Sequence, residues 1–107
     1  MTDFNDRKKG EEAKYAMDED AAFRVAARRN RLLGHWAAEK MDLTAEETDA
    51  YGKAVVQADF EEAGDEDVIR KVLGDMTAAG IDIDEAGVRA ALESKAIEAR
   101  RQLMSES

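Results

Sequence analysis

The fold of this chain is decided by one stretch of sequence, AARRNRLLGHWAAEK, at residues 26–40. On a helix of 3.6 residues per turn, its apolar side chains gather on one face with those just upstream. The members of this predicted buried face are Ala22, Val25, Ala26, Leu32, Leu33, Trp36 and Ala37. Arg29 and Lys40 lie in the same stripe, which is tolerable because long basic side chains can lay their stems on apolar surface. The stretch therefore predicts an amphipathic helix packed against other helices.

Gly34 interrupts this pattern and should cost the helix roughly 1 kcal/mol relative to alanine. A glycine inside an otherwise apolar helix indicates close approach by another backbone or by a bulky ring. We therefore expect a neighbouring segment to cross the helix at Gly34, while Leu32, Leu33 and Trp36 seat it in the core.

Composition narrows the class of protein. The chain has 107 residues, no proline and no cysteine, and 44% of it is hydrophobic but only 6% aromatic. This is typical of a small helical domain with an aliphatic core. It excludes disulfides, thiolate zinc sites and a cysteine nucleophile. No signal peptide and no run of about 20 apolar residues is present. We expect a soluble cytoplasmic protein with no direct membrane insertion.

The net charge of −9 argues against a nucleic-acid partner, because neutralising phosphates requires a basic face. Arg28, Arg29 and Arg31 form a local basic cluster, but they diverge around a helix. We expect them to pair with carboxylates of the same chain, and Arg29 with an internal one.

Helix boundaries can be predicted from capping signals. The first helix should begin near Asp18, where acidic residues suit the positive end of the helix dipole, and end near Lys40. Thr44-Ala45-Glu46-Glu47 is a capping box that starts a second helix. The apolar positions of this second helix are Tyr51, Ala54, Val55 and Ala58 on one face, with Val56 and Phe60 pointing away from it.

Gly64 should end the second helix and Asp65 should cap a third, which runs to about Ala79. Gly80 ends the third helix in a Schellman arrangement, and Asp84 caps a fourth. The predicted buried residues of these two helices are Ile69, Val72, Leu73 and Met76, then Val88, Leu92, Ala96, Ala99 and Leu103, with Ile83 and Val88 as a hydrophobic staple.

The whole pattern predicts an all-α protein: a four-helix bundle over residues 18–104 with a flexible N-terminal segment. Residues 105–107 should fray. Residues 1–17 are charged and poor in apolar side chains, so they cannot order themselves alone. They are either a frayed terminus or a segment that folds on a partner, with Phe4, Tyr15 and Met17 as anchors.

Catalytic and metal-binding patterns are scarce, so we expect no enzyme activity, no metal and no cofactor. His35 is the only histidine and is expected at the surface. The acidic run from Asp82 resembles part of a calcium loop, but Ala86 replaces a ligand, and Asp84 is explained as an N-cap. No phosphate-binding loop supports a nucleotide sensor.

The run ARRNRLLG-x-WAAE at residues 27–39, its distance from the N-terminus and the later DEAGVR at 84–89 resemble the zeta-subunit family. These are ATPase inhibitor subunits of alphaproteobacterial F-type ATP synthases. The resemblance covers essentially the whole chain. Its most specific positions are Arg28, Arg29, Asn30, Leu32, Leu33, Gly34 and Trp36.

The resemblance implies how the chain acts. In that family a mobile N-terminal segment becomes helical at a catalytic α/β interface of F1, near the γ shaft, and blocks rotation in the hydrolytic direction. This chain matches the family segment at Phe4, Asp6, Arg7, Glu12, Ala13, Lys14, Tyr15 and Ala16. The implied partners are the α, β and γ subunits of F1. The implied location is the cytoplasm, at the inner membrane through F1, and the free protein should be a monomer.

Two positions depart from the family pattern. Gly10 and Glu11 stand where members often have alanine and phenylalanine. Glycine should cost the bound helix roughly 1 kcal/mol, and loss of the phenylalanine a further ~2 kcal/mol. The competing hypothesis is a non-inhibitory helical adaptor that binds an acidic partner through the basic face of the first helix.

Overall fold

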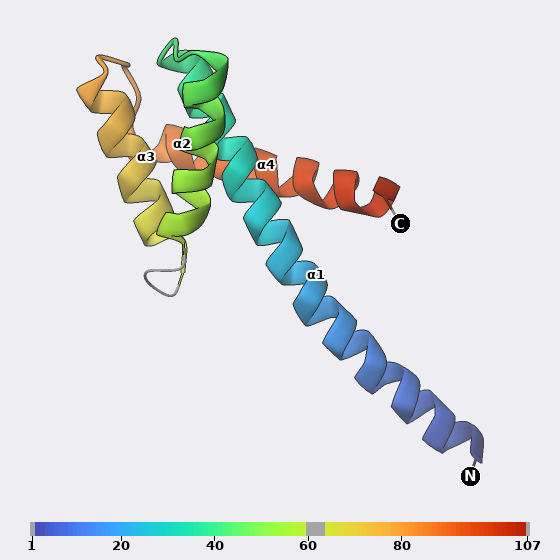
Figure 1. Cartoon of the computed structure of the whole chain (residues 1–107). Helices are drawn as coiled ribbons and strands as arrows, with labels where there is room; N and C mark the ends of the chain where they lie inside the picture. The colour runs from blue at the N-terminus through green and yellow to red at the C-terminus, as the bar shows by residue number, and fades with distance from the viewer. Residues whose placement is uncertain (1, 60–63, 107) are drawn as a thin grey trace.

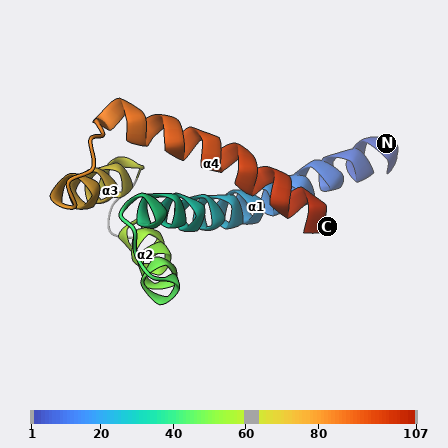
Figure 2. The same ribbon diagram turned by 90° about the horizontal axis from the view of Figure 1, so that it is seen from above.

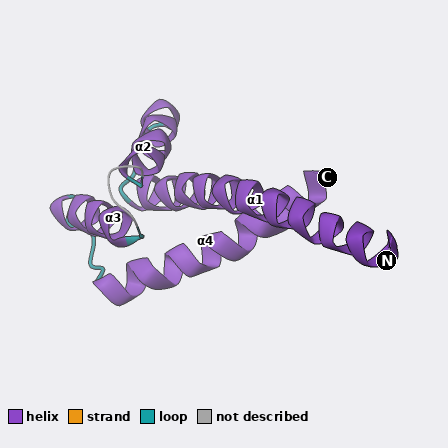
Figure 3. Ribbon diagram, turned by 90° about the horizontal axis from the view of Figure 1, so that it is seen from below, coloured by secondary structure: helices purple, strands orange, loops and turns teal. Residues whose placement is uncertain are grey.

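The computed structural model describes the backbone of residues 2–59 and 64–106 and the side chains of residues 21–59 and 64–105. It contains four helices: α1 (Thr2–Lys40), α2 (Ala45–Ala58), α3 (Glu66–Ala78) and α4 (Glu85–Glu106). No strand occurs in the described backbone. Figure 3 shows helices joined by short loops. The predicted all-α fold with four helices is confirmed.

The other three helices gather on the C-terminal half of α1. α2 and α3 lie side by side in Figure 1. Seen from above in Figure 2, α1 lies between α2 on one side and α4 on the other. The N-terminal part of α1 projects away from this bundle, and the molecule is correspondingly elongated, 63 × 25 × 21 Å.

The expected start of the first helix at Asp18 is wrong. α1 is continuous from Thr2, because no proline interrupts the segment and its Glu, Lys, Arg and Ala residues all favour a helix. The acidic residues 18–20 therefore lie inside α1 rather than at its start. At the other end of the chain, α4 continues through Ser105 to Glu106, past the expected limit of the bundle.

All four helices contribute to the hydrophobic core. Leu33 and Ala37 of α1 are fully buried as predicted, and Trp36 packs against the same cluster. Ala22, by contrast, was expected on the buried face and is exposed, because the buried residues among the described side chains of α1 begin only at Asn30. The core residues from the other helices are Val55, Val68, Ile69, Val72, Met76, Val88 and Leu92.

Three predicted caps are confirmed. Thr44 Oγ1 accepts a hydrogen bond from the backbone N–H of Glu47 at 3.2 Å, and the Glu47 carboxylate accepts one from Thr44 N–H at 2.9 Å. The second of these bonds lowers the pKa of Glu47. Gly80 has φ +84°, and Ile81 N–H donates to the Met76 carbonyl at 2.9 Å, which closes the Schellman motif.

The fourth helix is capped by Asp84, whose carboxylate accepts a hydrogen bond from Gly87 N–H at 2.8 Å. Asp65, in contrast, makes no side-chain cap for α3, so that prediction is wrong. Its carboxylate instead accepts a hydrogen bond from Arg29 at 3.0 Å. Phe60 and Ala63 lie outside the described residues.

A tyrosine joins α2 to α3. Tyr51 OH donates a 2.8 Å hydrogen bond to Asp75, whose carboxylate also accepts a 3.1 Å bond from Lys71 Nζ. The Lys71 ammonium lies 5.2 Å from the centroid of the Tyr51 ring. Burial, the bond to Asp75 and the charge of Asp75 all raise the pKa of Tyr51 well above its ordinary value.

Tyr51→Phe should lower the free energy of unfolding by about 1 kcal/mol at neutral pH, because the Asp75 carboxylate loses one donor. Because the pKa of Tyr51 is raised in the folded state, its contribution is present below about pH 10, the unfolded value, and is lost as the pH rises further. Urea unfolding of both proteins at pH 8 and above pH 10 should show the difference shrinking. A pH-independent difference would contradict the role of the phenolic proton.

Candidate functional site

The segment that the resemblance marks as inhibitory lies on the projecting part of α1. All eight of its matched positions, from Phe4 to Ala16, fall within Thr2–Lys40, so they are carried on one continuous helical backbone with the bundle. Their side chains lie outside the described set. Figure 1 shows this part of the helix, in blue, with none of the other three helices beside it.

A cluster of polar side chains lies further along α1, where the helix enters the bundle. Arg29 donates from Nε to Asn30 Oδ1 and from a terminal nitrogen to Asp65 Oδ1, each at 3.0 Å. The same terminal nitrogen lies 3.7 Å from Asp59 Oδ2, which also accepts a 2.9 Å bond from Asn30 Nδ2. These four residues, the Arg29 cluster, tie α1 to both ends of the α2–α3 connection.

Burial makes the Arg29 cluster structural. The Arg29 side chain is 14% exposed and Asn30 is 1% exposed. Buried polar groups require partners, and here each side chain has at least one. The prediction that Arg29 finds an internal carboxylate is confirmed. The burial of Asn30 was not predicted, because the sequence around it does not show which distant polar group would face it.

The two remaining arginines of the signature also contact the chain itself. Arg28 donates a 3.3 Å hydrogen bond to Gln102 of α4. Arg31 is exposed and lies 3.9 Å from Asp49, which also pairs with Lys53 at 3.4 Å. The basic cluster is thus largely engaged within the molecule.

The crossing of α1 and α2 is unusually close and is made by two glycines. A Cβ atom added to Gly34 would lie 2.7 Å from Gly52 Cα and 3.2 Å from both Gly52 N and Val55 Cγ2. The expectation of a close neighbour at Gly34 is confirmed, with the α2 backbone as that neighbour.

The surface position expected for His35 is wrong. Its ring is half-buried, and Nε2 is buried with no hydrogen-bond partner among the described residues. A Cβ on Gly52 would lie 2.8 Å from His35 Cδ2, so the ring occupies the space that this glycine leaves. The helical wheel placed His35 on the polar side, but α2 covers that side at the glycine crossing.

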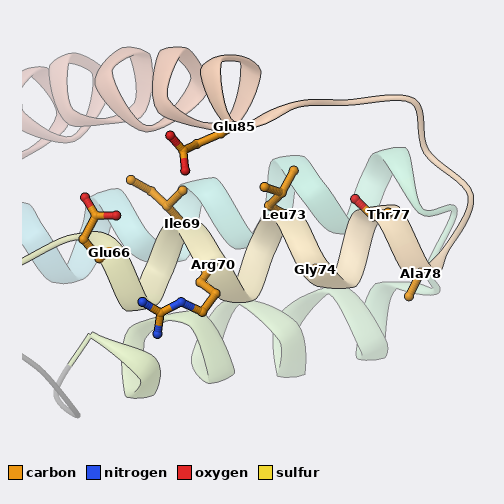
Figure 4. A pocket seen from close by; sticks show the side chains of 8 residues that line it. All are labelled: Glu66, Ile69, Arg70, Leu73, Gly74, Thr77, Ala78 and Glu85. Atoms are coloured by element: carbon orange, nitrogen blue, oxygen red, sulfur yellow. The ribbon is translucent and has the colours of Figure 1, made fainter.

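An open groove of about 590 Å³ runs between α3 and the first turn of α4 (Figure 4). Ile69 and Leu73 point into it toward α4, while Glu66 and Glu85 stand at its rim. Arg89 holds both glutamates, at 2.9 Å and 3.3 Å, which raises the pKa of Arg89. Two carboxylates at its rim make the groove unsuited to a phosphate. Among the described residues, no cluster could hold a metal ion.

Comparison with known protein families gives one assignment. The profile of the ATPase inhibitor subunit zeta family matches residues 1–102 of the chain. The chain belongs to this family. Members of this family are, in general, inhibitor subunits of an ATPase rather than enzymes. The match includes the projecting part of α1 as well as the bundle.

A solved structure agrees with the zeta-subunit assignment. A protein whose structure was determined by solution NMR is 49% identical and superposes with a TM-score of 0.71, covering 79% of this chain and 96% of its own. No curated protein matches the chain. Among the described helices of this zeta subunit, none has the length and apolar character needed to cross a membrane.

Proposed function

We propose that this zeta subunit inhibits ATP hydrolysis by inserting its N-terminal segment at a catalytic α/β interface of F1, near γ, where it blocks rotation in the hydrolytic direction. The observation that carries this proposal is the projection of residues 2–17 from the bundle as part of α1 (Figure 1). The family profile also includes this segment. A helix held out from a compact bundle can enter a cleft that the bundle itself cannot.

The energetics of an isolated helix suggest how the segment works. Helices without tertiary neighbours are marginal in water, and Gly10 costs roughly 1 kcal/mol more. We therefore propose that residues 1–17 are mobile in the free protein and are held in helical form by F1. The ordering cost then reduces the net affinity, which is the usual consequence of coupled folding and binding.

The competing adaptor hypothesis has less support. It requires the basic face of α1 to be available to a partner. Arg29 is instead enclosed by Asp59 and Asp65, and Arg28 is bonded to Gln102. Of the three arginines of the basic cluster, Arg28, Arg29 and Arg31, only Arg31 is exposed, and it makes a long 3.9 Å contact with Asp49. The cluster therefore offers one exposed arginine to an acidic partner.

We also infer the partners of this zeta subunit and its location in the cell from this proposal. The partners are the α, β and γ subunits of F1, and the free protein is a monomer. It reaches the inner membrane only peripherally, through F1, from the cytoplasm.

Phe4→Ala and Tyr15→Ala should each raise the half-maximal inhibitory concentration at least tenfold, because burying an aromatic anchor at the interface is worth about 2 kcal/mol. The melting temperature of the bundle should stay unchanged. Gly10→Ala should act in the opposite direction and strengthen inhibition about fivefold, since roughly 1 kcal/mol of helix cost disappears. The measurement is ATP hydrolysis by F1 from the same organism with each purified protein added.

Asn5→Ala is the matched control, since it alters the same segment at a position outside the matched set. It should inhibit like the wild type. Full inhibition by a Phe4→Ala, Tyr15→Ala double variant would remove the segment from the mechanism. A loss of bundle stability equal to the loss of inhibition would show that the segment packs on the bundle.

A further inference from the structure

The outward face of α4 carries exposed apolar side chains as well as charged ones. Ile97 is 51% exposed and Met104 is 77% exposed, and both lie on the same side of the helix as Arg100 and Arg101, which are also exposed. We call these four residues the α4 outer face. The opposite side of α4 carries the buried Val88, Leu92 and Ala99. The helix therefore carries apolar side chains on two sides, and only one of these sides contributes to the core.

The two arginines of this face are unusual in the molecule. Neither the Arg100 nor the Arg101 guanidinium makes an ion pair or hydrogen bond within the part of the chain whose side chains are described. Other arginines of the bundle have carboxylate partners: Arg29 has Asp65, Arg70 has Asp67, and Arg89 has Glu66 and Glu85. A chain with net charge −9 thus leaves two adjacent positive charges beside exposed apolar side chains.

The α4 outer face lies at the same end of the molecule as the proposed inhibitory segment. Figure 1 shows α4 passing behind α1, with its C-terminal turns extending beyond α1 on the side to which α1 projects. The bond from Arg28 to Gln102 fixes the last turns of α4 against α1. Phe23, 57% exposed, adds an apolar side chain on α1 between residues 2–17 and this contact. A complex that holds residues 2–17 therefore comes near the end of α4.

We propose that the α4 outer face is a second docking surface for the ATPase complex, and that it binds an acidic surface with an apolar contact. This inference rests on the proposed function for the identity of the partner. Arg100 and Arg101 meet carboxylates of the partner, while Ile97 and Met104 pack on its apolar side chains. Guanidinium groups suit this use because they pair with carboxylates in a bidentate fashion.

Two other occupants fit less well. An anionic membrane also attracts exposed basic and apolar side chains, but the remainder of this chain is strongly acidic and is repelled by such a surface. A second copy of the chain carries the same net charge of −9, so self-association works against long-range repulsion. A protein surface whose acidic patch is local presents less negative charge to the rest of this chain than a continuous anionic membrane does.

Docking through the α4 outer face should raise the affinity for F1 without changing how the inserted N-terminal segment blocks rotation. A second attachment raises the local concentration of the N-terminal segment at its interface, so occupancy is reached at lower total protein. Electrostatic attraction also accelerates association, and salt weakens it. The maximal inhibition, which depends on the inserted segment, stays the same.

The test compares two double charge reversals in the full-length protein. Arg100→Glu with Arg101→Glu alters the α4 outer face; Lys53→Glu with Arg70→Glu makes the same change in net charge at side chains 74% and 73% exposed on α2 and α3. Binding of each labelled protein to F1 and inhibition of hydrolysis are measured at low and physiological salt. We expect the α4 variant to bind and inhibit at least tenfold more weakly than the control, with unchanged maximal inhibition and a smaller salt dependence.

A second variant, Ile97→Gln with Met104→Gln, removes the apolar contacts and keeps the charges. It should also weaken binding. Equal affinity of the α4 variant and its control for F1 would overturn the inference. It would also be overturned if the wild type were a dimer and the α4 variant a monomer. Binding of the wild type to phosphatidylglycerol vesicles, lost in the α4 variant while F1 affinity is unchanged, would assign the face to the membrane and overturn it too.

The inference and the proposed function can fail separately. If Phe4→Ala with Tyr15→Ala still inhibits fully while the α4 variant binds F1 at least tenfold more weakly than its control, the segment mechanism fails and the docking surface stands. If the α4 variant matches its control while the segment variants lose inhibition, the docking surface fails alone. If the wild type does not bind F1, both fail.

Discussion

Valine at position 34 is expected to lower the free energy of unfolding by about 3 kcal/mol, because overpacking a close helix crossing typically costs 1–3 kcal/mol or more. This loss would occur although valine is a better helix former than glycine. The reason is the distance of 2.7 Å between a Cβ at this position and Gly52 Cα. A backbone atom cannot rotate away as a side chain can, so α1 and α2 would have to separate.

Substituting alanine at three of the helical glycines separates the effect of steric clash from that of helix propensity. Gly34→Ala should be net destabilising by about 1–2 kcal/mol, since the clash exceeds the gain of roughly 1 kcal/mol in propensity. Gly52→Ala should cost less, because its Cβ meets the His35 ring, which can turn. Gly74→Ala should stabilise by about 0.5–1 kcal/mol, because no atom lies within 4 Å of its Cβ position.

Urea unfolding followed by circular dichroism measures all four variants. The decisive comparison is Gly34→Ala with Gly74→Ala, which make the same chemical change in two helices. If the two variants were equally stable relative to the wild type, the close crossing would be contradicted. A separation of the helices in Gly34→Val should also expose the Trp36 ring to solvent, which a red shift of its fluorescence would report.

The same crossing shows how far the sequence alone could lead. A glycine within an apolar helical stripe predicted close contact at Gly34, and that part is confirmed. The partner, Gly52, could not be predicted, because helical periodicity describes one helix at a time and does not specify which helix crosses it. For the same reason the wheel placed His35 at the surface, whereas α2 covers its ring.

Local capping patterns were reliable where no distant group competed. Thr44, Gly80 and Asp84 all cap as their neighbours in sequence predict. Asp65 has the same kind of sequence context, but its carboxylate faces Arg29, thirty-six positions away in the chain. Arg29 brings a full positive charge to this carboxylate, whereas a backbone N–H of the first turn is a neutral donor. Long-range electrostatics therefore overrode the local signal.

The N-terminal segment shows a different limit. Its low apolar content predicted that it cannot pack, and in Figure 1 it lies apart from the other helices. Its helical backbone was not predicted, because the acidic residues 18–20 resemble the first turn of a helix. Nothing upstream of them breaks a helix, however, and α1 begins at Thr2. The positions assigned to F1 binding came from resemblance to a family, since composition alone favours a frayed terminus over a binding segment.

Removing the arginine at the base of the projecting helix is expected to have the second large effect. Arg29→Met should lower the free energy of unfolding by about 2–3 kcal/mol, because Asn30 Oδ1 is buried and loses its donor. Asp65 and Asp59 also lose their cation, although they are 46% and 22% exposed, so solvent compensates part of that loss. Arg29→Lys should rescue little, since one ammonium cannot reach three acceptors in a planar arrangement.

Arg70→Met is the matched control for this change. Its side chain is 73% exposed and pairs with Asp67 at 3.2 Å, so the variant should lie within about 0.5 kcal/mol of the wild type. A double-mutant cycle of Arg29→Met with Asp65→Asn should give a coupling energy of about 1 kcal/mol, as expected for contacting charged groups. Zero coupling, or equal stability of the Arg29 and Arg70 variants, would show that the Arg29 cluster contributes no more than a surface ion pair. The expected result instead makes Arg29 the residue that fixes the α2–α3 connection against α1, where the projecting part of α1 enters the bundle.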